Sequence, residues 1–339
     1  MVLTYEVKLY PNKRQESELS RILERTREYY NFVLGYMIDE YKKNGKGTHR
    51  YQVMKEIRGK FDDIPATVRQ STVERVSKSN RNFFRKKANF PRFKSENRYR
   101  SFEVRTYKQD YNFVDGKVRI WTKSIGSIRM KGFRPSESYG NGRVVKRASG
   151  WYFQYQATAK EKKVKKTLKK RVGLDMGLTS FLADSDGKTV KSLKFKNVGG
   201  KNRARIYEHI KNKRRDWLHK LSRVYADSYD FVAVEDLEIQ RMMGNKRFSK
   251  GIGLAAWGTF HHMLDYKLKM LGKTMVRVNP RGTSQTCLCG QRVEKDITVR
   301  VHNCPACGIV EDRDIVSAKL IKKIAWDGHL ASAKKLCIQ

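Results

Sequence analysis

Apolar and polar residues alternate at the start of the chain. Leu3, Tyr5, Val7 and Leu9 are each separated by one polar or charged residue. Because side chains of a strand point alternately to opposite faces, this two-residue period predicts a strand with one buried face. Pro11 follows directly and ends the predicted strand.

Further along the chain, apolar residues recur every three or four residues instead of every second residue. From about residue 13 to residue 43 apolar side chains recur at that spacing, which predicts a long amphipathic helix. Two shorter helices are predicted around 51–60 and 66–87, and the second begins after Pro65.

Short β-rich runs punctuated by glycine follow Pro91. The strands are expected at 101–107, 117–121, 127–131, 143–147 and 151–158. We expect the first strand to join them in a small barrel, with the helices as an insertion.

A basic stretch at 159–171 divides the chain, with eight Lys or Arg residues against one Glu. It is expected to be an exposed linker. The elements expected beyond it are strands at 172–175, 230–235 and 274–278, and helices at 201–224 and 255–271. This alternation predicts an α/β domain with a mixed sheet, so the chain as a whole is expected to be a multidomain α+β protein.

The net charge of the chain indicates which class of partner the protein binds. Its 339 residues carry 74 Lys and Arg against 34 Asp and Glu, a formal net charge of +40. A compact chain that repels itself this strongly needs a polyanion, usually nucleic acid, as its partner. No run approaches the roughly 18 apolar residues of a membrane span, and the N-terminus lacks a secretory pattern. We therefore expect a cytoplasmic protein with no membrane contact.

Three acids stand where strands end or a helix begins. Asp175 and Glu235 each end an apolar run, and Asp314 comes just before the helical spacing of 315–321. Carboxylates gathered from separate elements are suited to Mg²⁺ or Mn²⁺, and two such ions support phosphodiester hydrolysis. The alternative for each acid taken alone is a solvated strand end or a helix cap.

Four cysteines lie close together in the sequence, as Cys287, Cys289, Cys304 and Cys307. Cys304 and Cys307 have the CxxCG spacing of a zinc knuckle, and the first pair is one residue short of it. The alternatives are a distorted turn that still brings four thiolates to Zn²⁺, replacement of one ligand by His302, or four reduced cysteines without metal.

Basic and aromatic residues are interleaved over 81–107, and basic residues crowd one helix at 201–224. Rings stack on unpaired bases while Arg and Lys hold the phosphate backbone. The alternative is that the rings belong to a core and the charges to a solvated face. The candidate nucleic-acid contacts are Lys86, Lys87, Arg92, Lys94, Arg214 and Arg215.

These motifs together resemble the TnpB family of transposon-encoded RNA-guided nucleases. Residues 173–178, with Ser185-Asp186-Gly187 beyond them, are similar to its first RuvC motif, and residues 234–237 to its second. Residues 283–287, the cysteine pairs and residues 312–314 are similar to its zinc ribbon and third motif. The chain departs from the family at Val316, where an Asn is favoured, and in the first cysteine pair.

The resemblance implies a split β-barrel wedge domain with a helical recognition insertion, then a ribonuclease H-like (RuvC) nuclease domain with an inserted zinc ribbon. It places the wedge domain at 1–11 and 88–160, the helical domain at 12–87, the nuclease domain at 161–281 and 311–339, and the ribbon at 282–310.

The resemblance further implies an Mg²⁺-dependent endonuclease that uses a guide RNA to cut double-stranded DNA beside a short motif. Asp175, Glu235 and Asp314 would be catalytic, with Asp314 preferred to Asp312 because it directly precedes the helix. Gln70 is a candidate for contacting the motif duplex. A compact type V CRISPR effector, a non-cleaving RNA-guided repressor and a general RNA-binding protein with a zinc ribbon remain as alternatives.

Overall fold

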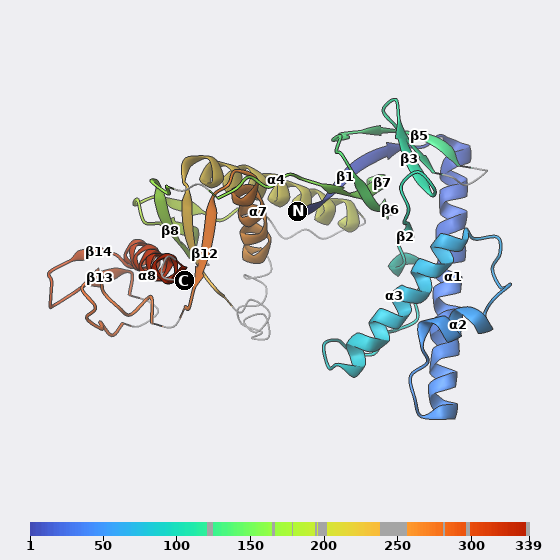
Figure 1. Cartoon of the computed structure of the whole chain (residues 1–339), viewed down its shortest axis with the longest axis horizontal. Coiled ribbons are helices and arrows are strands. Elements are labelled where there is room, and N and C mark those ends of the chain that lie inside the picture. The colour runs from blue at the N-terminus through green and yellow to red at the C-terminus, as the bar shows by residue number, and fades with distance from the viewer. Residues whose placement is uncertain are drawn as a thin grey trace. The chain divides into compact units, whose positions relative to one another are not determined.

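The computed structural model describes residues 1–120, 125–164, 167–177, 179–193, 195, 202–237, 256–280, 282–295 and 299–336, the last five by their backbone. The chain divides into two compact units, Met1–Ala159 and Lys160–Gln339 (Figure 1). The boundary lies at the start of the basic stretch expected to be a linker. Most of that stretch's described residues before Arg171 are exposed and outside helices and strands.

The first unit is built on a seven-stranded antiparallel sheet. Its strands are β1 (Val2–Tyr10), β2 (Ser101–Val104), β3 (Tyr111–Val114), β4 (Lys117–Ile120), β5 (Gly126–Lys131), β6 (Tyr139–Arg147) and β7 (Gly150–Thr158). In the order β2-β6-β7-β1-β5-β4-β3, the first strand lies between the hairpins, as the sequence predicts.

The sheet differs from the expected barrel at its edges. β2 and β3 are edge strands that do not pair with each other in the described residues, so the barrel is not closed. The strand predicted at 101–107 ends at Val104, because the Asp110 carboxylate accepts hydrogen bonds from the N–H groups of Arg105 and Thr106 (3.0 and 2.8 Å) and fixes a turn there. β3 follows this turn and has no counterpart among the predicted strands.

Three helices interrupt the sheet, α1 (Lys13–Asn44), α2 (Arg50–Glu56) and α3 (Ala66–Phe84), and a 3₁₀ turn, η1 (Glu96–Arg98), follows them. The first helix begins with a capping box in which Asn12 and Gln15 bond each other's backbone N–H groups. Gly45, with φ of 64°, ends it. The other two end at Glu56 and Phe84, earlier than predicted, and the positive φ of Gly59 and Lys86 just beyond them keeps the helices from continuing.

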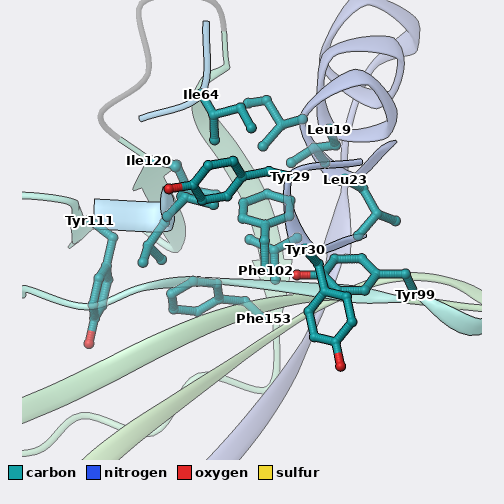
Figure 2. Packing of buried hydrophobic residues seen from close by; sticks show 14 of the residues in the cluster. Leu19, Leu23, Tyr29, Tyr30, Ile64, Tyr99, Phe102, Tyr111, Ile120 and Phe153 are labelled. Atoms are coloured by element: carbon teal, nitrogen blue, oxygen red, sulfur yellow. The ribbon is translucent and has the colours of Figure 1, made fainter. Parts of the chain in front are cut away.

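The helices and the sheet share one core. Leu19, Leu23 and Tyr30 of α1 pack with Phe102 and Phe153 of the sheet (Figure 2). Two rings of the interleaved stretch 81–107 are therefore core residues, because Tyr99 and Phe102 are each 2% exposed. For these two rings, the alternative that they belong to a core rather than stack on bases is therefore correct.

The second unit is built on a mixed five-stranded sheet, as predicted. Its strands are β8 (Arg171–Met176), β9 (Ser180–Asp184), β10 (Thr189–Lys191), β11 (Phe231–Glu235) and β12 (Thr274–Val278), in the order β10-β9-β8-β11-β12. The strands β8, β11 and β12 are parallel, and β9 and β10 run against them. Asp186-Gly187 forms the turn between β9 and β10, with Gly187 at φ of 92°.

Helices cover both faces of this sheet. Val232 and Val234 of β11 pack toward α4 (Arg203–Ser228) and α7 (Trp257–Met270), whereas Phe231 and Ala233 pack toward α8 (Arg313–Leu336). A strand buried on both faces is a continuous apolar run, which explains its sequence. A two-stranded ribbon, β13 (Val301–Asn303) and β14 (Val310–Asp312), leads into α8. No helix in the described ranges is long and apolar enough to cross a membrane.

Candidate carboxylate site and cysteine cluster

Two of the three predicted acids lie side by side at the carboxyl ends of neighbouring strands. In the parallel pair β8 and β11, Val234 stands opposite Leu174. Asp175 and Glu235 are the next residues along each strand. Glu235 is buried, and its Oε1 accepts a hydrogen bond from the Thr283 hydroxyl. The sheet register therefore brings together two carboxylates that are 60 positions apart in the sequence.

The third acid comes from α8, which passes very close to β8. A Cβ built on Gly173 would lie 2.0 Å from the Ala318 carbonyl oxygen and 2.8 Å from the Lys322 nitrogen. Only glycine permits this approach, because real Cβ atoms essentially never come within 3.0 Å of another atom. Glycine at this position therefore lets α8 carry Asp314 toward Asp175.

Asp312 and Asp314 have different roles at the start of α8. The Asp312 carboxylate accepts hydrogen bonds from the N–H groups of Asp314 (2.9 Å) and Ile315 (3.2 Å), so Asp312 caps the helix. Asp314 lies in the first turn of the helix rather than directly before it, which corrects the expectation. With Asp312 engaged in capping, Asp314 remains the acid available to the site.

Asp175 lies within the electrostatic influence of the other two acids. Burial raises the pKa of Asp175 well above its usual value, and the charges of Glu235 and Asp314 raise it further. Burial also raises the pKa of Glu235, against the effect of the Thr283 hydrogen bond. The carboxylates are not in direct contact as a set, because in the described ranges only the four cysteines have ligand atoms all within 4.8 Å of one another.

Two arginines contact the third acid. The distance from Arg300 Nη1 to Asp314 Oδ2 is 3.4 Å, and Arg300 Nη2 donates to the Thr179 hydroxyl at 2.9 Å. Arg313 Nε lies 3.3 Å from Asp314 Oδ1. The sequence analysis missed Arg300 and Thr283. Arg300 is brought in by the ribbon, where the Arg313 N–H donates to the Arg300 carbonyl, and no local pattern signals this contact.

The four predicted cysteines converge despite their unequal spacing. Sγ of Cys287 is 3.5 Å from that of Cys307, and Sγ of Cys289 is 3.7 Å from that of Cys304. A tetrahedral Zn²⁺ with Zn–S bonds of about 2.3 Å separates its sulfurs by about 3.8 Å. The cluster therefore has the chemistry and spacing of a Zn²⁺ site.

Each cysteine pair is closed by a glycine in the left-handed region. Gly290 (φ 95°) donates its N–H to the Cys287 carbonyl, and Gly308 (φ 73°) donates to the Cys304 carbonyl. The shorter pair thus makes a comparable turn, which is the distorted-turn alternative of the sequence analysis. His302 is not part of the group of four.

Desolvation alone raises the pKa of the Cys304 thiol. Backbone N–H groups of Cys307 and Ala306, together with the thiols of Cys287 and Cys307, outweigh that effect and bring the pKa down to about 7. These N–H groups favour the thiolate, which is the form that binds metal.

The predicted nucleic-acid contacts are scattered over both units. The exposed ones are Gln70 on α3, Lys86 and Lys87 just beyond it, Arg92, and Arg215 on α4. Lys94 and Arg214 are half-buried. The backbone of Lys94 is bonded to Asn31 in both directions, which fixes its position against α1. Their contact with nucleic acid stays a prediction.

The fold and the site define a class: two-part α+β proteins whose second unit joins a mixed sheet to a four-cysteine ribbon. The domain family described as "Cas12f1-like, TNB domain" matches residues 257–321, which span α7, the cysteines and the start of α8. A second family, described as the helix-turn-helix domain of IS605 OrfB, matches residues 1–46. In this chain those residues form β1 and the single helix α1, followed by Gly45 and Lys46.

Similar proteins extend over nearly the whole chain. A Streptomyces pristinaespiralis protein, named as a proposed RNA-guided DNA endonuclease, is 24% identical over 94% of this chain and 88% of its own length. Escherichia coli K12 InsQ, named likewise, is 24% identical over 94% of this chain and 90% of its own length. The TnpB-like protein MJ1635 of Methanocaldococcus jannaschii is 34% identical over 35% of this chain and 28% of its own length. The chain belongs to the TnpB, or IS605 OrfB, family.

A solved structure of the Cas12f1-sgRNA-target DNA complex aligns with 95% of this chain and 99% of its own. Its sequence identity is 15% and its TM-score is 0.34, too low to support a structural inference.

Proposed function

We propose that this protein is a transposon-derived, RNA-guided and metal-dependent DNA endonuclease. The relatives from Streptomyces and E. coli that align over nearly the whole chain carry names that describe an RNA-guided DNA endonuclease. The observation in this chain that carries the proposal is the placement of Asp175 and Glu235 at adjacent strand ends, with Asp314 brought toward them by α8. One buried and two half-buried acids in such a basic protein need a reason, and a cation site supplies one.

The donor set fits a hard divalent cation. Three carboxylates offer only oxygen ligands, which Mg²⁺ and Mn²⁺ prefer. Burial, and then the charges of Glu235 and Asp314, raise the pKa of Asp175, so a bound cation would stabilise its ionised form. Such ions, when bound, would supply activation of a water molecule and stabilisation of the leaving oxygen.

The surrounding residues hold the acids in place, and one of them would contact the substrate. The Thr283 hydroxyl fixes Glu235, and the capping carboxylate of Asp312 fixes the helix turn that carries Asp314. Arg300, half exposed and beside Asp314, is placed to contact a phosphate of the DNA. Guanidinium groups favour phosphate because their N–H donors match its oxygens.

The proposal also assigns domains within the two units. The sheet of β1 to β7 would be the wedge domain (1–11 and 88–160), and α1 to α3 its helical recognition insertion (12–87). The mixed sheet with its acids would be a ribonuclease H-like (RuvC) domain (161–281 and 311–339), with the zinc ribbon at 282–310. The continuous sheet that the helices interrupt supports the first division. The cysteine cluster supports the ribbon.

The guide would supply sequence specificity by base pairing, while the protein binds the backbone and a short duplex motif. The net charge of +40 supports a nucleic acid as the partner. Guide RNA and double-stranded target DNA are therefore the partners we assign.

The test is cleavage by the chain loaded with its transposon-end RNA and supplied with Mg²⁺. Asp175→Asn keeps the shape of the side chain and removes its charge. We expect it to abolish cleavage while RNA binding remains. Asp236→Asn is the matched control, because Asp236 follows Glu235 directly but is exposed and paired with Arg277 (3.2 Å). Full cleavage by Asp175→Asn would refute the site, and binding without cleavage by the unaltered chain would favour a repressor.

A further inference from the structure

A pocket lies in the first unit, whereas the three acids belong to the second unit. Its walls are the end of α1, the segment 47–50 that begins α2, and the last turns of α3 with the residues just beyond. Its volume is about 730 Å³. Small-molecule sites are typically about 300–1,000 Å³, so the hollow is large enough for one.

Aromatic rings that the core does not use line this pocket. Phe83, Phe84 and Phe90 are 36, 50 and 45% exposed, and Tyr41 is 44% exposed. The rings form a chain of contacts, with centroids 5.1 Å apart for Phe83 and Phe90 and 5.5 Å apart for Tyr41 and Phe84. Leaving several rings exposed together forgoes hydrophobic burial, and such clusters mark interaction sites.

Among the described residues that line the pocket, the Lys and Arg side chains are Lys42, Arg50, Arg81 and Arg85, and none is an Asp or Glu. We call these four cationic residues the basic rim. Arg50 is paired with Glu74 at 3.4 Å, and among the described residues no ion pair involves the other three. A fitting ligand therefore has a flat aromatic part for the rings and a negative charge for the rim.

We propose that this pocket binds an unpaired nucleotide of the guide RNA, with the base against Phe84 and the adjoining phosphates at the basic rim. This inference rests on the proposed function, because it takes the guide RNA as the ligand. Proteins recognise RNA chiefly at unpaired bases, which stack on aromatic side chains. The ribose 2′-hydroxyl, which DNA lacks, gives the basic rim a further group to contact in RNA. A second copy of this chain fits poorly, because its net charge of +40 would meet the basic rim.

The experiment uses the full chain and a short single-stranded RNA of uridines with one central 2-aminopurine, whose fluorescence falls when it stacks. Measurements at elevated salt weaken the purely electrostatic binding of so basic a chain. We expect quenching with the unaltered chain. Phe84→Ala should weaken binding about 5- to 140-fold, the range that corresponds to one stacked base. Phe84→Tyr, which keeps the ring, should restore it.

Tyr10→Ala is the matched control, because Tyr10 is an aromatic residue of the same unit, 43% exposed, that lies outside 81–107 and does not line the pocket. Equal loss from both variants would overturn the pocket as the site, and equal affinity for the corresponding DNA oligomer would overturn the assignment to RNA. Concentration-dependent self-association that Phe84→Ala removes, with RNA binding unchanged, would assign the pocket to a second copy instead. None of these readouts involves cleavage, so failure of the nuclease proposal at Asp175 is scored separately.

Discussion

Substitution of Gly173 by Ala tests how the carboxylate site is assembled. The added Cβ would lie 2.0 Å from the Ala318 carbonyl oxygen, whereas ordinary contacts begin at 3.4 Å. The difference, 3.4 − 2.0, means that α8 must move away from β8 by about 1.4 Å. The atoms in the way are helix backbone, so side-chain rotation cannot relieve the overlap.

The expected cost has two parts. Overpacking of this kind destabilises a protein by about 1–3 kcal/mol. For a unit of this size, each kcal/mol lowers Tm by about 2–4 °C, so a drop of about 2–12 °C is expected. Cleavage should fall by about 100-fold or more, because α8 carries Asp314 and a misplacement near 1 Å has that effect on catalysis.

The assay combines thermal unfolding, zinc content and cleavage of guide-matched DNA. Gly328→Ala is the control, since Gly328 lies in the same helix and an added Cβ would meet nothing within 4 Å. That variant should be more stable by about 0.5–1 kcal/mol and fully active, because alanine favours helix more than glycine does. An unchanged Tm and normal cleavage in Gly173→Ala would refute the close packing of α8 on β8. Loss of cleavage with zinc retained would locate the effect at the acids.

Further predictions concern the cysteine cluster, the hydrogen bond between Tyr225 and Asp184, the role of Arg300 and the salt dependence of RNA binding. Cys304→Ser should lose the zinc that metal analysis finds in the unaltered chain; equal zinc in both would contradict the cluster as its site. Tyr225→Phe removes the hydroxyl that donates to the fully buried Asp184 at 2.8 Å, which should lower the free energy of unfolding by about 1.5–3 kcal/mol in denaturant titrations. Arg300→Ala should leave Tm unchanged, because Arg300 is half exposed, but lower cleavage at least about 10-fold by removing the cation beside Asp314; normal rates would exclude a role for it. Guide-RNA affinity should fall about 10³- to 10⁵-fold between 50 and 200 mM salt if 6–10 phosphates are contacted, and a flat salt dependence would contradict this.

The sequence by itself determined the elements whose signals are local. Side-chain periodicity located β1 and α1, because the two- and 3.6-residue periods follow from backbone geometry alone. Apolar runs ending in acids located Asp175 and Glu235, and the number of cysteines indicated a metal cluster. Each of these inferences needs only neighbouring residues.

Only the tertiary structure decided which distant residues meet. Arg300 and Thr283 reach the acids through a ribbon and a loop, and no spacing along the chain records those contacts. Tyr99 and Phe84 stand in the same basic and aromatic stretch, yet one ring is core and the other lines a pocket. Burial depends on what packs opposite a residue, which local pattern does not contain. For the same reason, the sequence could not predict the unpaired edges of the first sheet or the close approach of α8 to Gly173, which only the folded chain reveals.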